Sequence, residues 1–511
     1  MDRRAFLMAA GMSALAAWAE RTGAALAEEI GEPPVPFSWD LLKAEAKALS
    51  AKPYDPGRYK APPDVANLNY DRYRAIAFNP DKAVWHDEPP LNFRLQLFHG
   101  GYIYKEPISI SIVEDGKASR IPYKRDFYEF GTVEKRVDVG ESGYYSGFRV
   151  HAPIYDPNDY SEFLVFQGAS YFRAKAKGQT YGLSARGLAI NTAQNGEEEF
   201  PLFTGFWVEK PKPGSKIVTV YAMLDSKSVS GAYRFVTTLE SDTVMDIECQ
   251  LYPRETIAWA GIAPFSSMFF FGPGDQTHFD DFRPRVHDSD GLSIHTGNGD
   301  WIWRPIVTAR HILYSVFFDT NPKGFGLIQR ERRFEAYQDI GAAYQDRPSA
   351  WIEPKGEWGE GSVDLVELPT GTEYADNIVA FWRPKDPLQP GGDYNYAYRL
   401  TWLYQAPEPV ELAKIVQTRV GEGLTPGSRF MLIDFAGGDI SPDASEQMWD
   451  FDVHASAGSI KGYSVVPHPF IDGKRIGIEY FPDGNKVADL SFQIRRMGMP
   501  ISEKWVYRWA P

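Results

Sequence analysis

Two stretches of this chain combine carboxylates with aromatic side chains. Residues 286–305 read VHDSDGLSIHTGNGDWIWRP and hold Asp288, Asp290 and Asp300. Further on, YQDIGAAYQDRPSAWIEPKGEWGEG is followed by GTEYADNIVAFW, which holds Glu373 and Asp376. Cleavage of a glycosidic bond needs one carboxylic acid to protonate the leaving oxygen and one carboxylate to activate water or to attack. These stretches are therefore candidates for such chemistry, although aspartates are also common turn residues in β-proteins.

Carbohydrate-binding clefts pair aromatic platforms with polar groups, because sugars have apolar faces and polar edges. Six residues of the two stretches are candidates for substrate binding: Trp301, Tyr344, Arg347, Trp351, Trp358 and Glu373. Each of them fits a purely structural role equally well, since large aromatic side chains also fill β-sandwich cores.

The sequence lacks the motifs of other common enzyme classes. No Walker-type phosphate loop, HExxH zinc motif or Gly-x-Ser-x-Gly nucleophile elbow is present, and one cysteine excludes a zinc finger. The DSDG segment opens like a calcium loop, but Leu292 and Gly299 occupy positions that need oxygen ligands. We therefore expect neither a metal nor a cofactor.

The composition limits the class of partner. The chain has 511 residues, 43% of them hydrophobic, and a net charge of −14. An acidic chain gains nothing from counterion release at nucleic acids or at an anionic membrane surface, so we expect neither as a partner. An uncharged substrate remains compatible.

The N-terminus has the features of an export signal. Arg3 and Arg4 precede a mild apolar stretch, and Ala25-Leu26-Ala27 forms a small-x-small cleavage pattern. We interpret residues 1–27 as a bacterial twin-arginine signal peptide, which predicts a periplasmic protein without stable membrane insertion. With Cys249 as its only cysteine, the protein has to be stable without an intramolecular disulfide.

Strands dominate the predicted secondary structure. One helix is indicated, with Ser38 as its N-cap, apolar residues at Leu42, Ala46 and Leu49, and a stop before Pro53. From about residue 92 onward, alternating runs such as SKIVTVYAML (215–224) are separated by Gly and Pro turns. The pattern predicts an all-β protein.

The last hundred residues contain short alternating strands at the spacing of an immunoglobulin-like sandwich. We place a large β-domain at 28–404, a linker at 405–415 and the small domain at 416–511.

Several of these segments carry a family likeness. The chain resembles the bacterial osmoregulated periplasmic glucan biosynthesis proteins G and D, and the D branch more closely. The matching stretches, which span roughly 167–381, are GASYFRA, YGLSARGLAI, EEFPLFTGFW, LDSKSVSGAYRF, GIAPFSSMFFFG, HDSDGLSIHTGNGDWIWRP, NPKGFGLIQR, YQDIGAAYQDRPSAWIEP and ADNIVAFW.

The resemblance implies a large galactose-mutarotase-like sandwich joined to a small immunoglobulin-like one, acting on β-1,2-glucan in the periplasm. Members with known activity are endo-acting glucanases that invert the anomeric centre. By position, Asp376 matches the family's general acid and Asp288 its general base, which reaches water through a substrate hydroxyl. Asp290 and Asp300 are then expected to be turn or supporting residues.

These roles set physical requirements. Asp376 has to stay protonated near neutral pH, which calls for burial or a neighbouring carboxylate such as Glu373, whereas Asp288 has to be ionised. Two alternatives stay open: a β-1,2-glucan transglycosylase, including one that closes rings, and a non-catalytic glucan-binding scaffold linked to a membrane glucan synthase. An epimerase would rest on fold analogy alone.

Overall fold

The computed structural model describes residues 33–88, 91–131, 143–274 and 279–511, so the predicted signal peptide lies outside the described residues. The predicted helix is confirmed as α2 (Trp39–Ser50). The Ser38 hydroxyl accepts the Leu41 N–H at 3.2 Å, and Leu42 and Ala46 are buried. Within the described ranges, no helix has the length and apolar character needed to cross a membrane.

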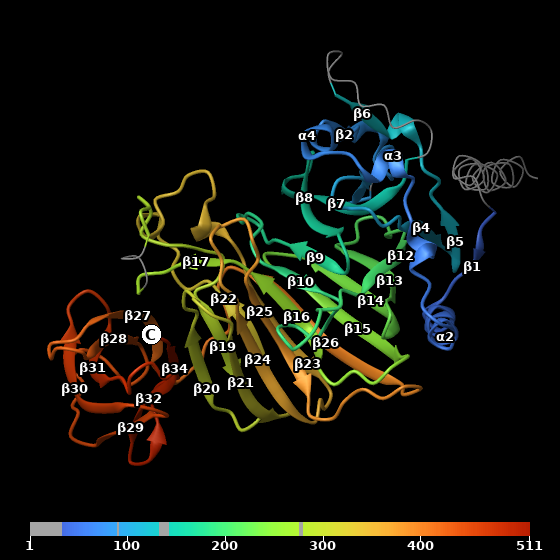
Figure 1. The fold of residues 1–511 in the computed structure, drawn as a ribbon. Helices are drawn as coiled ribbons and strands as arrows, with labels where there is room; N and C mark the ends of the chain where they lie inside the picture. Colours follow the sequence, from blue (N-terminus) through green and yellow to red (C-terminus); the bar gives the residue numbers. More distant parts are fainter. Residues whose placement is uncertain (1–32, 89–90, 132–142, 275–278) are drawn as a thin grey trace, which may run out of the picture.

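The remaining helical elements are short. They are η1 (Pro56–Tyr59), α3 (Pro63–Ala66), α4 (Tyr70–Arg74), η2 (Pro80–Lys82), η3 (Arg125–Phe127), η6 (Phe334–Ala336) and η7 (Tyr344–Asp346). In Figure 1, α3 and α4 lie at the upper right, beside the strands β2 (Ile76–Phe78) and β6 (Tyr128–Phe130), which pair with each other.

A 16-stranded sheet runs through both the large and the small sandwich (Figure 1). Its order is β1 (Val35–Pro36), β5 (Lys117–Arg120), β4 (Ser109–Glu114), β12 (Leu202–Glu209), β13 (Ile217–Asp225), β14 (Val229–Leu239), β15 (Thr243–Pro253), β26 (Tyr394–Leu403), β23 (Ser349–Lys355), β22 (Gly324–Ile328), β19 (Gly291–His295), β20 (Trp301–Pro305), β34 (Lys504–Trp509), β32 (Ala488–Arg496) and β29 (Trp449–Ala455), with β33 (Met499–Pro500) beside β32.

A 10-stranded sheet packs against it. Its order is β21 (Leu313–Thr320), β24 (Glu360–Glu367), β25 (Ile378–Pro384), β16 (Ala260–Ser267), β10 (Ser184–Arg186), β9 (Tyr171–Ala174), β8 (Asp159–Gln167), β7 (Tyr145–Asp156) and β3 (Arg94–His99), with β11 (Leu188–Ile190) beside β16. A short ladder pairs β17 (Phe269–Phe271) with β18 (Val286–His287).

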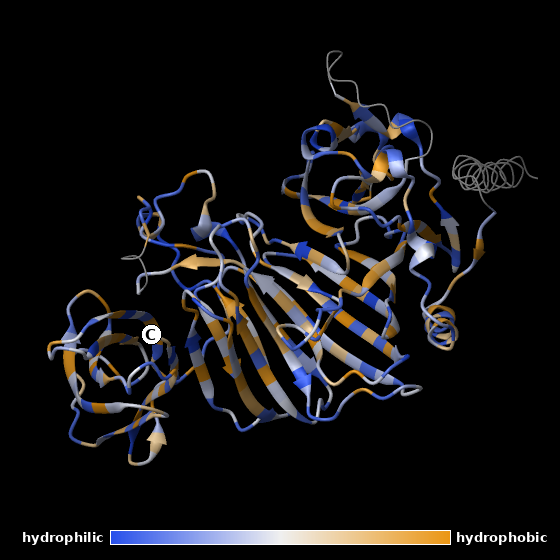
Figure 2. Cartoon of the chain, viewed as in Figure 1, coloured by the Kyte–Doolittle hydropathy of each residue, from blue (hydrophilic) through white to orange (hydrophobic). Residues whose placement is uncertain are grey.

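Aromatic contacts hold the two sheets together. Phe148 on β7 packs on Phe206 on β12 with ring centroids 5.2 Å apart, and Phe166 on β8 packs on Phe235 on β14 at 5.1 Å. The predicted alternation in β13 is confirmed, and the inward residues Val218, Val220, Ala222 and Leu224 are fully buried. Figure 2 shows such hydrophobic and hydrophilic bands along the strands of the large sheet.

A second core lies at the C-terminal end. There β27 (Lys414–Glu422), β28 (Arg429–Ala436), β31 (Gly473–Phe481) and β30 (Ser459–His468) form a four-stranded sheet. Its inner side chains share a core with β32 and β34; members from both sides are Ile415, Met431, Phe435, Phe492 and Trp505.

The two sandwiches are joined through the large sheet. β34 pairs in parallel with β20, Ile302 opposite Lys504 and Trp303 opposite Trp505. An all-β chain with a larger and a smaller sandwich is thus confirmed. The residue boundaries assigned to the domains stay a prediction, with β26 ending at Leu403 and β27 beginning at Lys414.

Candidate active site

Asp288 is the most enclosed of the candidate carboxylates. It follows β18, its backbone N–H donates to the Met268 carbonyl at 2.8 Å, and its side chain is 5% exposed. Arg347 donates from Nη1 to its Oδ1. Burial raises the pKa of Asp288 to about 6; the Arg347 guanidinium opposes this rise, while the nearby Asp376 charge adds to it.

The turn that carries Arg347 is fixed from two sides. Arg332 donates to the carbonyls of Gln345, at 3.0 Å, and of Arg347. Gly182 packs directly against Arg347, since a Cβ at position 182 would lie 2.9 Å from the Arg347 Cβ. A side chain at position 182 would therefore displace the Arg347 side chain, whose guanidinium is bonded to Asp288.

Tyr344 and Glu373 form a second pair beside the first. The Tyr344 hydroxyl donates to Glu373 Oε2 at 2.6 Å, and Arg283 Nη1 donates to the same oxygen at 2.6 Å. The Arg347 guanidinium lies over the Tyr344 ring, 4.2 Å from its centroid. Burial raises the pKa of Tyr344, and the bond to Glu373 raises it further, so the phenol stays neutral and donates.

Asp376 lies in the connection between β24 and β25. Its side chain is 35% exposed, and Arg173 Nη2 on β9 lies 3.8 Å from its Oδ2. Its neighbour Asn377 is buried and brackets Phe269: Asn377 Oδ1 accepts the Phe269 N–H at 2.8 Å, and its Nδ2 donates to the Phe269 carbonyl at 3.0 Å. Because the Asp288 backbone is bonded to Met268, the segments that carry the two carboxylates are both fastened to Met268 and Phe269.

The structure thus brings Tyr344, Arg347 and Glu373 together around Asp288, with Asp376 close enough for its charge to affect the pKa of Asp288. Burial was expected at Asp376, the predicted acid, but Asp288 is the buried carboxylate. Glu373 is engaged by Tyr344 and Arg283, and Asp376 faces solvent next to a cation.

The three candidate tryptophans lie in the cores. Trp301 stacks on Trp351 at 5.7 Å, both within the second core, and also on His295 at 4.4 Å. Trp358 belongs to the main core and packs edge-on against Tyr396 at 5.7 Å. These contacts are structural, and the structure does not bring the three rings to Asp288; a role in substrate binding stays a prediction.

Asp290 and Asp300 occupy supporting positions, as expected. Asp290 Oδ2 accepts the backbone N–H groups of Arg330, at 2.6 Å, and Glu331, at 2.8 Å. Asp300 closes the β19–β20 hairpin, where its N–H donates to the Thr296 hydroxyl at 2.9 Å and its carbonyl accepts the Thr296 N–H at 2.9 Å.

Sequence reasoning missed Arg173, Arg283 and Asn377. Arg173 is an outward residue of a short strand about 200 residues from Asp376, and no spacing rule joins the two. Asn377 follows an aspartate and has the composition of a turn residue. Only the fold shows that its amide fastens the Asp376 segment to β17.

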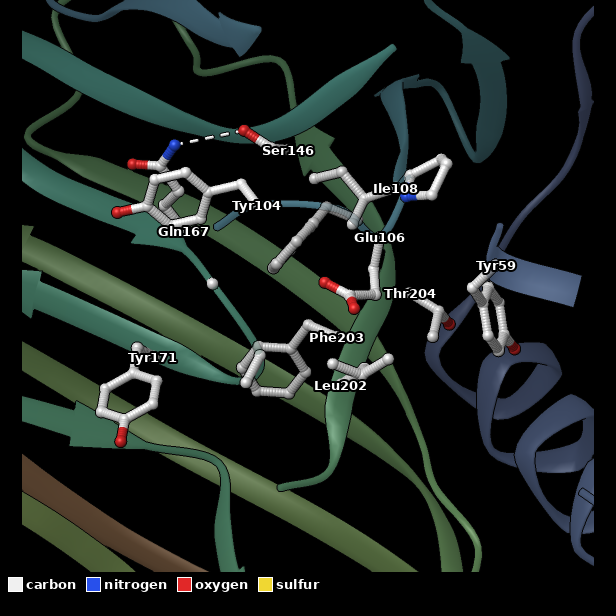
Figure 3. A pocket seen from close by; sticks show the side chains of 14 residues that line it. Tyr59, Tyr104, Glu106, Ile108, Ser146, Gln167, Tyr171, Leu202, Phe203 and Thr204 are labelled. Atoms are coloured by element: carbon white, nitrogen blue, oxygen red, sulfur yellow. Dashed lines mark hydrogen bonds between the residues drawn. The ribbon is translucent and has the colours of Figure 1, made fainter. Parts of the chain in front are cut away.

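A hollow lies beside β9, the strand that carries Arg173 (Figure 3). It has about 420 Å³ of space including its mouth, and Tyr59, Tyr104, Glu106 and Tyr171 are among the residues that line it. Tyr171 precedes Arg173 by two residues on β9, so both side chains leave the same face of the strand. The hollow and Arg173 are therefore neighbours along one strand.

No group of three or more potential metal-binding side chains of His, Cys, Asp or Glu was found in the part of the chain that the structure describes. Among solved structures, a chondroitinase AC lyase aligns with a TM-score of 0.13 and 8% identity over 70% of this chain and 44% of that chain, which supports no conclusion.

Sequence comparison is decisive for the family. Residues 37–509 match the family model described as "Periplasmic glucan biosynthesis protein, MdoG". The "Glucans biosynthesis protein G" of Rhodopseudomonas palustris (strain BisA53) is 45% identical over 93% of this chain and 94% of its own length. The proteins of that name from Bradyrhizobium diazoefficiens and Vibrio cholerae are 44% and 41% identical over 93% of this chain, and over 94% and 87% of their own lengths. The resemblance to the G and D proteins is thereby confirmed at the level of the family, while the expected closeness to the D branch stays a prediction. The chain belongs to the MdoG family of periplasmic glucan biosynthesis proteins.

Proposed function

We propose that this protein is an anomer-inverting endo-β-1,2-glucanase that controls the backbone length of periplasmic glucans. Family membership supports glucan as the substrate. The observation that carries the catalytic part is a pair of carboxylates in two unlike environments, Asp288 buried against Arg347 and Asp376 exposed beside Arg173, on segments that are both fastened to Met268 and Phe269. Glycoside hydrolysis by inversion needs such a division between an acid and a base.

Asp288 is suited to the role of base. With a pKa of about 6 it is mostly ionised at neutral pH, yet it binds a proton more readily than an ordinary aspartate. The Arg347 bond stabilises the charged form and fixes the orientation of the carboxylate. In this proposal Asp288 takes the proton of the attacking water through a substrate hydroxyl.

Asp376 is suited to the role of acid once glucan is bound. In the free chain its carboxylate is exposed to water, and a sugar chain covering it would remove that water and favour the protonated form. After the proton passes to the leaving oxygen, Arg173 at 3.8 Å stabilises the carboxylate that remains. A glucan running along β9 from Arg173 would next meet Tyr171 and the hollow beside it.

The test uses the mature protein with linear β-1,2-glucan, and resolves the products by size and by reducing ends. Asp376→Asn and Asp288→Asn are compared with Asp300→Asn, a matched control whose side chain lies in the exposed β19–β20 hairpin. We expect new reducing ends with wild type and the control, and none with the two active-site variants.

Other product patterns favour the alternatives. Cyclic or rearranged products without new reducing ends would indicate transglycosylation. Binding without any change in the glucan would contradict the proposed catalytic function and favour a glucan-binding scaffold.

A further inference from the structure

Arg332 ends the anchor segment, residues 329–332, which follows β22 and lies against the turn that carries Arg347. Its Nη1 donates to the carbonyls of Gln345, at 3.0 Å, and of Arg347. Its Nη2 donates to the carbonyl of Tyr404, the residue after β26, at 2.8 Å, and the guanidinium lies 4.4 Å from the centroid of the Tyr404 ring. One side chain therefore connects the turn beside the proposed base to the end of the last strand of the large sandwich.

The acceptors of Arg332 are neutral. Besides the three carbonyls, its guanidinium bonds the Ser349 hydroxyl at 3.1 Å, and none of the acceptors is a carboxylate. Burial lowers the pKa of Arg332, because neutral oxygens compensate a buried charge less well than a carboxylate does. What the arrangement supplies is geometry, since a planar guanidinium holds several acceptors at fixed relative positions.

Gln329, at the other end of the anchor segment, holds the same turn. Its Nε2 donates to the carbonyls of Tyr344, at 3.1 Å, and His287, at 3.0 Å. His287 directly precedes Asp288 in the chain. One amide group therefore fastens the turn and the residue before Asp288 to each other.

The small sandwich holds the anchor segment through Glu503. Arg330 donates to the two oxygens of Glu503 at 2.9 and 2.7 Å, and Glu503 is fully buried. Glu503 also accepts the N–H of Ile415 in β27 at 2.8 Å. From the large sandwich, Asp290 accepts the N–H groups of Arg330, at 2.6 Å, and Glu331, at 2.8 Å. The anchor segment is thus fixed from both domains.

We propose that Arg332 is a positioning residue, which sets the Arg347 guanidinium on Asp288, and that Glu503 of the small sandwich supports it by holding the anchor segment. Arg332 acts through the turn, because its bonds go to the backbone of that turn. The catalytic consequence rests on the proposed function. The effect on the contact between Asp288 and Arg347 does not.

The charge of Asp288 reports where Arg347 lies. Asp288 faces Arg347 and Tyr344 from the turn, Arg173 from β9 and Asp376 from the β24–β25 connection. Arg347 favours the charged form both by its own charge and by its hydrogen bond. A turn that is no longer held lets Arg347 move away, so the pKa of Asp288 rises.

The test compares Arg332→Met with Arg333→Met in the mature protein. Arg333 is the matched control, because it is the next residue, its side chain is 73% exposed and its guanidinium bonds Glu331. A crystal structure of Arg332→Met should show the Arg347 guanidinium displaced from Asp288. At neutral pH its kcat/KM should fall about tenfold or more, as for other displaced catalytic groups. The acidic limb of kcat/KM should move up by about half a pH unit or more. The control should change neither.

Two further variants separate positioning from folding. Arg332→Lys keeps the charge but replaces the planar fork with a flexible ammonium group, so it should fold and shift the acidic limb in the same direction. Glu503→Gln keeps the shape and leaves Arg330 without its counter-charge, and we expect a smaller shift of the same sign. An unchanged limb in Glu503→Gln would overturn the part assigned to the small sandwich.

The proposal and the proposed function can fail separately. In wild type the free energy of unfolding should fall between about pH 4 and 6 as Asp288 loses its proton, and in Arg332→Met this range should extend upward. That measurement and the crystal structures need no activity, so an inactive wild type would contradict the proposed function alone. An unchanged contact between Asp288 and Arg347 in both Arg332 variants, with an unchanged pH range, would overturn the proposal.

Discussion

The two carboxylates of the candidate site lie on segments fastened to the same two residues, Met268 and Phe269, but their surroundings are opposite. Around Asp288 the chain is closed: the side chain is 5% exposed, Arg347 is bonded to it, and Gly182 packs behind Arg347. Around Asp376 the chain is open: a third of the side chain meets solvent, and the neighbouring Tyr374 is 91% exposed. In the proposed mechanism the base side is thus already formed in the free protein, whereas the acid side is completed by the substrate. Five predictions test this contrast.

The largest effect is expected from removing either carboxylate. Asp288→Asn and Asp376→Asn should each lower kcat by about 10²–10⁴-fold, the usual contribution of a general acid or base. An aryl β-glucoside with a good leaving group needs no acid, so it should restore activity to Asp376→Asn and not to Asp288→Asn. Steady-state kinetics on both substrates checks this, and restoration of Asp288→Asn would reverse the two roles.

A pair of glycine variants compares the closed and open sides. Gly182→Ala places a Cβ 2.9 Å from the Arg347 Cβ, whereas a Cβ at Gly371, in the connection that carries Asp376, meets nothing within 4 Å. We expect kcat/KM to fall about tenfold or more for Gly182→Ala, because small displacements of catalytic groups are costly, and to change less than twofold for Gly371→Ala. Equal losses would show that the two sides are equally packed.

The pH dependence follows from Asp288. Its pKa is raised from 3.8 to about 6, so kcat/KM should fall about tenfold per pH unit below 6 as the base becomes protonated. The folded state binds this proton more tightly than the unfolded state, so the free energy of unfolding falls as pH rises from about 4 to 6, by about 2–3 kcal/mol in total.

Asp288→Asn should remove this cost. At pH 7 the variant should be more stable than wild type by up to about 2–3 kcal/mol, with the difference vanishing below pH 4. Urea unfolding at several pH values measures it. A variant that is less stable than wild type at pH 7 would mean that the Arg347 bond outweighs the cost of burial.

The smallest effect is expected at the hollow of Figure 3. Tyr171→Phe keeps the ring and should leave cleavage of all chain lengths nearly unchanged, whereas Tyr171→Ala should raise KM for long glucans about threefold to tenfold, as loss of one stacking contact implies. Short glucans that do not reach Tyr171 should be cleaved as before. A uniform loss for every length would instead indicate a structural role for the ring.

Much of the architecture could be predicted because it is local. The α2 helix follows from the Ser38 cap and its apolar spacing, and β13 follows from strict alternation. The resemblance predicts Asp288, composition predicts Tyr344, Arg347 and Glu373, and the four residues lie together in the structure. Arg173 and Asn377 could not be found, because their roles depend on strand order, which brings β9 beside the Asp376 segment.

The tryptophans show the limit of composition. Trp301, Trp351 and Trp358 have the residue type of a sugar platform, yet they fill the cores. A strand residue points to one face or the other by register, and a platform is told from a core residue only once the packing of both faces is known.

The parallel pairing of β20 with β34 has a consequence for how the chain folds. Ile302 and Trp303 pair with residues about 200 positions further along the chain. Forming this pairing closes a long loop, which costs conformational entropy and makes the step slow. Until β34 arrives, β20 is an unpaired strand edge next to the segment that carries Asp288, able to pair with another chain. We therefore expect the small sandwich to be completed late in folding, and its completion to remove an edge at which the large sheet could misassemble.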